Sequence, residues 1–380
     1  MKADFMIGKK FTSHRLLEYP NRKGETEFFG NGTYYFEKLF SDLSHAKSTI
    51  HLSFYRFKHD SSGKQLLDVL KQKAAEGVKV RLLLDLFGSL RFPQDAVKDL
   101  KENGIEFAYS HIPSFPLIFT TLNRRNHHKI VVIDGRLGFV GGFNVGDNYA
   151  EKDSQTGFWR DYMVRIKGSG AEDLQKQFLE DWAKAGMDIG KTDNLFPELR
   201  EGSTAFRLAA NSGGSLDTKL LDLIQSANKR IIIGSPYFIP TAKVARALIK
   251  ARNRGVKIIV ILPEKADHIL VKERALTEFT SLIQEGITLF LYQKGFYHAK
   301  LMLVDQQAAY VGTSNFDIRS FRTNDEMVLF TEDPTMLREI EINFHEDLEC
   351  SKKQELSDVK AGGILSKVKR GLAYVFTNFL

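Results

Sequence analysis

Residues 126–134 have the sequence NHHKIVVID and are followed by GGFN at 141–144, and the pattern returns as HAKLMLVD at 298–305 followed by GTSN at 312–315. In both copies Lys stands two residues after His, Asp five residues after Lys, and Gly seven residues after Asp. Alternate side chains of a strand share a face, so we expect each His–Lys pair to project together from a buried strand. A lone His near a Lys is usually a surface accident, but the repeat of the whole spacing argues against that interpretation.

The doubled motif resembles the signature of the phospholipase D superfamily. Three stretches resemble bacterial cardiolipin synthases in particular: the first copy at 126–144, SPYFIP at 235–240 and NFDIRSF at 315–321. The resemblance implies an α/β fold in which two similar phospholipase D-like α/β/α sandwich halves pack around one shared central active site. Residues 1–200 would form the half with the first motif, and residues 201–380 the half with the second motif and an amphipathic tail.

Periodicity along the chain predicts alternating helices and strands. Apolar residues at helical spacing predict helices at 34–46 and 171–185, for example, and apolar runs predict strands at 78–86 and 256–262. The alternation favours a mainly parallel sheet with helices on both faces. Residues 1–30 are polar and are expected to have little structure, and the Pro- and Gly-containing segment 192–203 is the best candidate boundary. After it the order repeats, as GVKV at 77–80 and GVKI at 255–258 also indicate.

Composition is that of an ordinary globular protein, and it limits the compartment. The 380 residues suffice for two domains, and the net charge of +7 suits an anionic partner or simply a solvated basic surface. The single cysteine, Cys350, excludes an internal disulfide framework and suits a reducing compartment. No run approaches the ~20 apolar residues that span a bilayer. Since cardiolipin synthases usually begin with membrane-spanning helices, we expect a location on the cytoplasmic face of the bacterial cell membrane, either peripheral or through an N-terminal anchor missing from this chain.

The two histidines can support phosphodiester exchange. A neutral imidazole is a competent nucleophile and an imidazolium is a competent general acid. The resemblance implies that His127 attacks phosphorus to give a phosphohistidine. His298 would then protonate the departing alcohol and later deprotonate the incoming one.

The remaining polar residues of the motifs suit a negatively charged transition state. Lys129 and Lys300 are expected to supply positive charge to the phosphate oxygens, and Asn144 and Asn315 to supply amide donors. Two lysines can perform the electrostatic work of a divalent metal, so we expect no metal and no cofactor.

Each histidine also requires a partner that fixes its tautomer. The resemblance implies that Asp161 and Glu326 orient the histidines, whereas Asp134 and Asp305 are structural. Residue spacing places Gln155, not Asp161, opposite Glu326, and an exposed carboxylate at a strand end is the alternative for both acids. Which carboxylate serves which histidine stays open.

Other features allow two interpretations each. The apolar stretch 115–119, beside Arg124 and Arg125, is either a loop packed on the core or a lip that contacts acyl chains. The stripe at 364–380 is either a docked helix or an interfacial helix on an anionic membrane. His128 is expected to be structural, His51 to be a surface or satisfied core residue, and His111 is uninformative.

The leading hypothesis is therefore a phosphatidyltransferase of the cardiolipin synthase type, with phosphatidylglycerol and an anionic membrane surface as its partners. Water as acceptor would instead make the protein a phospholipase D, and serine a phosphatidylserine synthase. A nuclease of the same superfamily is a further alternative, but no stripe of interleaved basic and aromatic residues favours nucleic acid. The oligomeric state cannot be predicted from the sequence.

Overall fold

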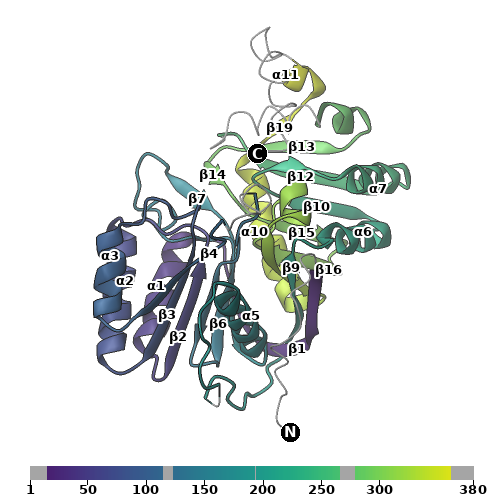
Figure 1. Cartoon of the computed structure of the whole chain (residues 1–380). Helices are drawn as coiled ribbons and strands as arrows, with labels where there is room; N and C mark the ends of the chain where they lie inside the picture. The colour runs from purple at the N-terminus through teal and green to yellow at the C-terminus, as the bar shows by residue number, and fades with distance from the viewer. Residues whose placement is uncertain (1–14, 114–122, 193, 266–278, 361–380) are drawn as a thin grey trace.

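One sheet of 15 strands runs through the whole molecule (Figure 1). The computed structural model describes residues 15–113, 123–192, 194–265 and 279–360. The strands of the sheet are, in chain order, β1 (Arg15–Phe29), β2 (Thr49–Phe54), β3 (Lys79–Asp85), β4 (Glu106–Ser110), β5 (Ile130–Ile133), β6 (Leu137–Gly141), β8 (Met163–Gly168), β9 (Thr204–Ser212), β10 (Arg230–Gly234), β12 (Lys257–Pro263), β13 (Thr288–Tyr292), β15 (Leu301–Val304), β16 (Ala308–Gly312), β18 (Asp325–Thr331) and β19 (Ser351–Gln354).

The strand order is the same in both halves of the chain. Outward from the central pair β1 and β9, one half follows the order β1-β8-β6-β5-β2-β3-β4, and the other follows β9-β18-β16-β15-β10-β12-β13, with β19 added at its edge. In Figure 1 the strands β2, β3 and β4 of the first half lie on the left, and β10, β12 and β13 of the second half lie on the right. The predicted α/β class with two similar halves is thus confirmed, and the corresponding strands β5 and β15 lie within the two motifs, directly after the His–Lys pairs.

The expectation of a mainly parallel sheet is wrong. Only β2–β3, β3–β4, β10–β12 and β12–β13 pair in parallel within the large sheet. The hairpins β5–β6 and β15–β16, and the strands that follow them, pair antiparallel. Parallel neighbours require a crossover connection, usually a helix, but the short connection after each motif lets the chain return antiparallel beside the strand that it has just formed.

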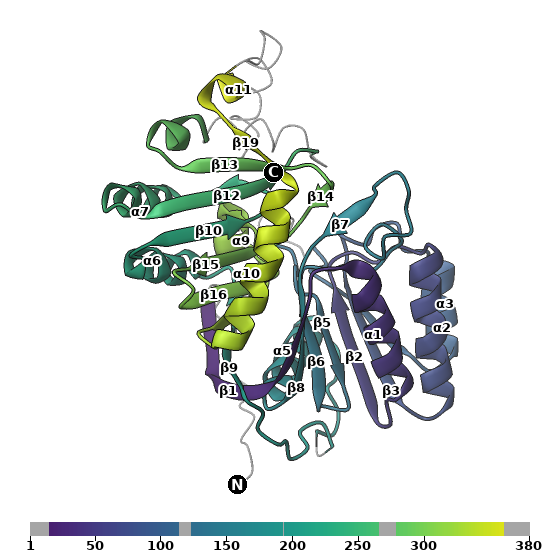
Figure 2. The same ribbon diagram turned by 180° about the vertical axis from the view of Figure 1, so that it is seen from behind.

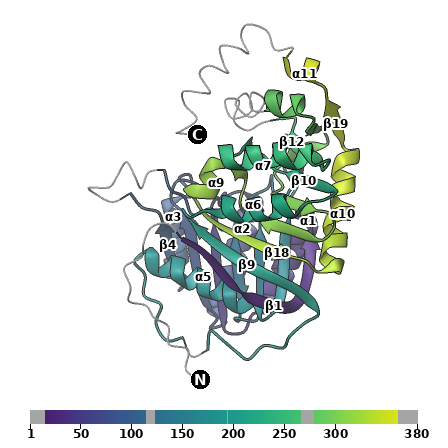
Figure 3. The same cartoon turned by 90° about the vertical axis from the view of Figure 1, so that its right-hand side faces the viewer.

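The prediction of little structure in residues 1–30 is also wrong from residue 15 on, because Arg15–Phe29 forms the long strand β1. One edge of β1 pairs with β8 and the other with β9, so β1 connects the two halves (Figures 2 and 3). The register shifts between Glu18 and Asn21, around Pro20, which has no amide hydrogen to donate. Pairing on both edges imposes the strand on a polar segment that lacks apolar alternation.

Helices cover both faces of the sheet, and alternate strand residues divide between them. In β2, Ile50 and Leu52 belong to the core under α1, α2 and α3, whereas His51 packs on Phe178 of α5 on the opposite face. The helices with full bounds are α1 (Gly32–Ser44), α2 (Ser61–Ala75), α3 (Gln94–Glu102), α5 (Gly170–Lys184), α6 (Leu216–Ser226), α7 (Ala242–Asn253), α9 (Ile318–Arg322), α10 (Pro334–Glu349) and α11 (Leu356–Lys360). Within the described residues, none of the helices is long and apolar enough to cross a bilayer.

Short strand pairs outside the large sheet bring the motifs together. β7 (Phe158–Arg160) pairs in parallel with β14 (Gly295–Tyr297), which belongs to the other half. A single bridge joins Asn126 to Asp325 in the same parallel sense. Within the second half, β11 (Phe238–Ile239) pairs with β17 (Phe316–Asp317). The first two contacts place Tyr297 beside Arg160, the last residue of β7, and Asn126 beside Asp325, the first residue of β18.

Three expectations concern segments outside the described residues. They are residues 1–14 of the polar N-terminal segment, the apolar stretch 115–119, and the amphipathic tail at 364–380.

Candidate active site

The motif histidines and lysines precede their strands and do not lie within them. His127 and Lys129 come immediately before β5, and His298 and Lys300 immediately before β15. The expectation that each pair projects from a strand therefore requires this correction. All four side chains are nonetheless buried, with the two histidines 8% exposed. The buried strand that follows each pair anchors it from one side only.

Backbone hydrogen bonds between the halves hold the histidines in place. The His127 amide donates to the carbonyl oxygen of Asp325 at 2.9 Å, and the Asp325 amide donates to the carbonyl of Arg125 at 2.8 Å. In the other half the His298 amide donates to the carbonyl of Arg160 at 2.7 Å. Each histidine is thus fixed by the residue that precedes an acidic side chain of the opposite half.

Those acidic side chains contact the imidazoles directly. His127 Nδ1 lies 2.9 Å from a Glu326 carboxylate oxygen, and His298 Nδ1 lies 2.6 Å from Asp161 Oδ2. Both carboxylates are buried with no exposed surface. Each carboxylate therefore orients the histidine of the other half, which the spacing of residues could not decide. Because Nδ1 is engaged, chemistry at either ring would use Nε2.

The register of the sheet explains why residue spacing from the motifs matched Gln155, and not Asp161, to Glu326. Gly141 pairs with Met163, and Gly312 pairs with Val328. Counting back two residues from each partner reaches Asp161 in one half and Glu326 in the other. The first half has a longer connection between β6 and β8, so equivalent residues stand at unequal distances from the motif.

The residue that follows Gly141 in one half and Gly312 in the other differs between the halves. The acidic side chain that it contacts, Asp161 or Glu326, differs as well. A Cβ atom at Gly142 would lie 1.9 Å from Asp161 Oδ1, so only glycine leaves room for that carboxylate. The second half has Thr313 at this position, and its hydroxyl donates to Glu326 Oε2 at 2.5 Å. One half thus holds a short acid against a glycine, and the other holds a long acid with a hydroxyl donor.

Each motif lysine contacts the backbone carbonyl of its own motif histidine. Lys129 Nζ donates to the carbonyl oxygen of His127 at 2.8 Å, and Lys300 Nζ contacts the carbonyl of His298 and lies 3.4 Å from Asp161 Oδ2. Burial lowers the pKa of Lys129 to about 7, against the opposing effect of Glu326. An anion placed beside Lys129 would raise its pKa again and restore the full positive charge.

Electrostatics differ between the two histidine–carboxylate pairs. Burial first, and then Lys129 and Lys300, hold the pKa of His127 well below its ordinary value. Burial also raises the pKa of its partner Glu326 to about 7. Although their distance suits an ion pair, both shifts favour a neutral pair.

Asp161, the partner of His298, shows the opposite shift. Burial raises the pKa of Asp161, but the combined effects of Lys300, His298 and hydrogen bonds outweigh it and lower the pKa below its ordinary value. Asp161 is therefore anionic at neutral pH, and His298 Nδ1 contacts both this carboxylate at 2.6 Å and Lys300 Nζ at 2.5 Å.

The motif asparagines are also buried near the histidines. Asn144 Oδ1 accepts a hydrogen bond from the backbone amide of Arg56 at 2.9 Å. Asn315 is 7% exposed, and its Oδ1 has no hydrogen-bond partner within the described part of the chain.

The motif aspartates lie at the far ends of β5 and β15, away from the histidines. Asp134 accepts hydrogen bonds from the amides of Lys47, Ser48 and Thr49, which lead into β2. Asp305 in the same way accepts from the three amides of residues 228–230 that lead into β10. Both aspartates have positive φ, 53° and 52°. They close the turns that join neighbouring strands.

The other histidines form structural contacts. His128 Nδ1 lies 2.6 Å from Asp181, and His51 is buried and hydrogen bonded to Gln175, as expected for a core residue. His111, which was uninformative in the sequence, contacts Asp325 at 3.1 Å.

Two aromatic residues beside the histidines were missed in the sequence. The ring of Tyr55 lies 5.0 Å from that of His127, centroid to centroid, and the ring of Trp159 lies 5.1 Å from that of His298. Tyr55 directly follows β2. Residues at the carboxyl end of a strand with a parallel neighbour often belong to a functional site, so the position of Tyr55 after β2 could have identified it as a site residue.

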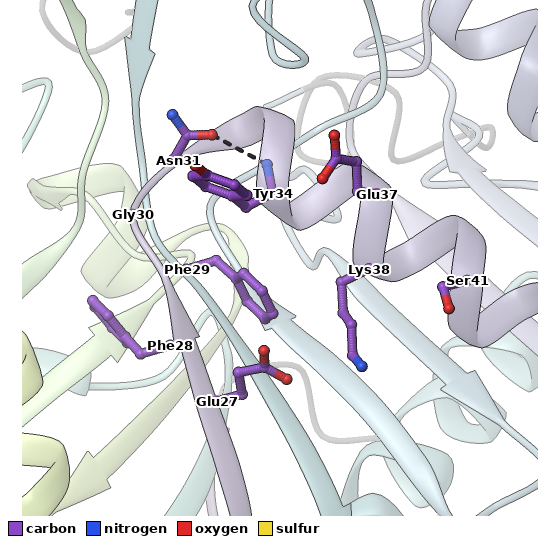
Figure 4. A pocket seen from close by; sticks show the side chains of 9 residues that line it. All are labelled: Glu27, Phe28, Phe29, Gly30, Asn31, Tyr34, Glu37, Lys38 and Ser41. Atoms are coloured by element: carbon purple, nitrogen blue, oxygen red, sulfur yellow. Dashed lines mark hydrogen bonds between the residues drawn. The ribbon is translucent and has the colours of Figure 1, made fainter.

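Neither a metal cluster nor the hollow shown in Figure 4 defines this site. Among the described residues, no group of three or more His, Cys, Asp or Glu is arranged to hold a metal ion. An open hollow of about 520 Å³ lies between the end of β1 and α1 (Figure 4). It is lined by Glu27, Phe28, Phe29, Gly30, Asn31, Tyr34, Glu37, Lys38 and Ser41, and none of the candidate site residues is among them.

Comparison with known proteins agrees with this geometry. The family described as "Cardiolipin synthase, PLD-like domain" matches residues 39–182 and 220–348. The chain is 34% identical over 358 residues to the minor cardiolipin synthase ClsB of Bacillus subtilis, covering 93% of this chain and 89% of the relative. It is 37% identical over 392 residues to cardiolipin synthase 2 of Staphylococcus epidermidis, covering 100% of this chain and 80% of the relative. The crystal structure of phosphatidylserine synthase from Haemophilus influenzae shares the fold, with a TM-score of 0.70, 16% identity and 95% of each chain covered. The chain belongs to the cardiolipin synthase family of phospholipase D-like proteins.

Proposed function

We propose that the protein is a cardiolipin synthase that transfers a phosphatidyl group from one phosphatidylglycerol to a hydroxyl of another and releases glycerol. His127 Nε2 attacks the phosphorus atom, and the P–O bond to glycerol breaks as His298 gives that oxygen a proton. The hydroxyl of the second phosphatidylglycerol then gives its proton to His298 and attacks phosphorus. The P–N bond breaks, cardiolipin leaves, and both histidines return to their starting states.

The unequal histidine–carboxylate pairs are the observation that carries this assignment of roles. A nucleophile must be neutral, and the lowered pKa of His127 keeps its imidazole neutral at physiological pH. A general acid must hold a proton, and the anionic Asp161 supports an imidazolium at His298. The proposed transfer needs one neutral imidazole as nucleophile and one protonated imidazole as general acid.

The remaining site residues act on the phosphate. Lys129 and Lys300, one from each half, would neutralise the non-bridging oxygens, and Asn144 and Asn315 would donate amide hydrogens to them. Since the groups are already buried, little reorganisation is needed as negative charge develops. This is the main source of rate enhancement that we expect from the site.

The choice of lipid substrate follows from the relatives, several of which are named cardiolipin synthases. The same histidine chemistry with water or serine as acceptor would give a phospholipase D or a phosphatidylserine synthase. We place the protein at the membrane surface, on the cytoplasmic side, because its substrates are phospholipids and its single cysteine suits a reducing compartment. We also propose that the boundary between the two halves along the sequence lies between α5 and β9, near residue 200.

The test is to incubate the protein with phosphatidylglycerol liposomes and identify the lipid products. Cardiolipin with an equal amount of glycerol supports the proposal. Phosphatidic acid alone would show a hydrolase, and a product only in the presence of added serine would show a phosphatidylserine synthase.

The roles of the histidines are tested separately by intact-protein mass spectrometry. The His298→Asn protein should accumulate a phosphatidyl adduct slowly, because His127 can still attack but the intermediate cannot readily discharge. The His127→Asn protein should form none. An adduct on the His127→Asn protein alone would reverse the two roles.

A further inference from the structure

The two sides of the active site differ in charge, although the motifs that build them are repeated. Arg125 stands two residues before the first motif histidine, and Phe296 stands two residues before the second. Arg319 stands four residues after the second motif asparagine, and Asn148 stands four residues after the first. On the His298 side, Phe296 stacks on Trp159 at 4.6 Å. One side is thus aromatic where the other carries two arginines.

Arg125 is a half-buried cation without a carboxylate partner. Its guanidinium stacks on the ring of Phe87 at 4.0 Å, and Nη1 donates to the carbonyl of Arg124 at 2.7 Å. In the described part of the chain no carboxylate oxygen lies within ion-pair distance of it. The nearby Asp85 accepts hydrogen bonds from three backbone amides, with both of its oxygens. A stacked guanidinium that presents its remaining donors in this way suits a phosphate.

Arg319 adds a like charge from the other half of the protein. It belongs to α9, and its Nη2 donates to the carbonyl of Asn123 at 3.1 Å. Arg319 and Arg125 are close enough for their charges to oppose one another, and the pKa of Arg125 is lowered by burial first and also by Arg319. Two half-buried guanidinium groups held together repel one another, and an anion between them would relieve this repulsion.

This arginine pair lies beside the site and extends across its rim. The ring of Tyr55 contacts that of His127. Burial raises the pKa of Tyr55, and the charges of Arg56, Arg125 and Arg319 each lower it. Arg56 is exposed, and its side chain also interacts with the hydroxyl of Tyr149, whose ring lies 4.7 Å from Trp159 on the His298 side. The three arginines therefore lie on the His127 side of the site, and the backbone amide of Arg56 also binds the motif residue Asn144.

We propose that Arg125 and Arg319, with Arg56 at the rim, form a second phosphate site that holds the phosphodiester of the acceptor phosphatidylglycerol. This inference rests on the proposed function. The acceptor carries its own phosphate, one glycerol away from the hydroxyl that attacks. Bringing that anion up to the phosphate at the histidines is electrostatically unfavourable unless further positive charge is present. Water, serine and free glycerol carry no phosphate, so the site would select for a lipid acceptor.

The experiment compares two reactions of one enzyme, one with an acceptor that carries a phosphate and acyl chains and one with an acceptor that carries neither. Cardiolipin formation uses phosphatidylglycerol as acceptor, whereas exchange of labelled glycerol into phosphatidylglycerol uses glycerol. Both pass through the same intermediate. The ratio of the two rates is measured in the wild type, Arg125→Gln, Arg125→Lys, Arg319→Gln and the control Lys294→Gln. Lys294 is exposed and lies over the ring of Phe158 on the other side of the site.

We expect the ratio of cardiolipin formation to glycerol exchange to fall roughly ten- to hundredfold in Arg125→Gln and Arg319→Gln, as for loss of one charge-assisted hydrogen bond. Arg125→Lys should recover part of the ratio, and Lys294→Gln should leave it unchanged. An unchanged ratio in both glutamine variants, or an equal fall of the two rates, would overturn the second phosphate site alone. A wild-type enzyme that exchanges glycerol but forms no cardiolipin would overturn the proposed function as well.

Discussion

Replacing Glu326 by Gln should stabilise the folded protein at alkaline pH while it slows the reaction. Glu326 has no exposed surface, and burial raises its pKa from the ordinary 4.5 to about 7, against the lowering effect of Lys129. A carboxyl with a raised pKa contributes stability that is fully present below pH 4.5 and is lost as the pH rises through about 7. The wild type should lose roughly 3 kcal/mol of unfolding free energy over that interval, and a glutamine cannot lose it.

The assay is urea unfolding of the wild type and of Glu326→Gln between pH 5 and pH 8. The stability of the variant relative to the wild type should rise by roughly 3 kcal/mol across this range and level off above pH 7. Over the same range its cardiolipin synthesis should be roughly ten- to hundredfold slower, because His127 loses the carboxyl group that contacts Nδ1 and fixes its tautomer. The control Glu102→Gln removes a carboxylate that is 65% exposed, and should show neither effect. A stability difference that stays constant with pH would refute the argument that Glu326 resists ionisation.

The remaining predictions concern other parts of the chain. Gly142→Ala should cost at least about tenfold in activity, measured as lipid product, because its Cβ would displace Asp161; normal activity would contradict the contact. Asp134→Ala should lower the free energy of unfolding by about 2–4 kcal/mol at pH 7, and the deficit should shrink as the pH falls, since hydrogen bonds to backbone amides outweigh burial and lower the aspartate's pKa. Activity should persist in excess chelator because the motif lysines supply the positive charge; loss of activity that magnesium or zinc restores would contradict this. Deleting residues 364–380 should weaken co-sedimentation with anionic liposomes without unfolding the protein, and unchanged binding would favour a docked helix.

Several features were accessible from residue patterns because they depend on local chemistry. The doubled motif, its lysines and its asparagines could be found by spacing alone. Helices such as α1 and α2 follow from apolar residues at helical intervals, and α2 ends before Gly77, whose φ of 89° a glycine adopts without strain. The strands that follow the motifs are continuous apolar runs buried on both faces.

Other features could not be predicted, because they arise from contacts between distant segments. β1 is polar, and it is a strand only because β8 and β9 supply hydrogen bonds to both of its edges. The equivalence of Asp161 and Glu326 is hidden by a longer connection and appears only in the register of β6 with β8 and of β16 with β18.

The proposed division of labour between the histidines depends most strongly on the folded chain. Two motifs of the same spacing give two histidines of the same intrinsic chemistry, and nothing in the repeat distinguishes them. Burial and two lysines hold the pKa of His127 below its ordinary value, while an anionic Asp161 from the opposite half lies beside His298. Because the charge state of a buried group is set by its solvation and by neighbours brought from distant parts of the chain, this asymmetry exists only once the halves have packed together.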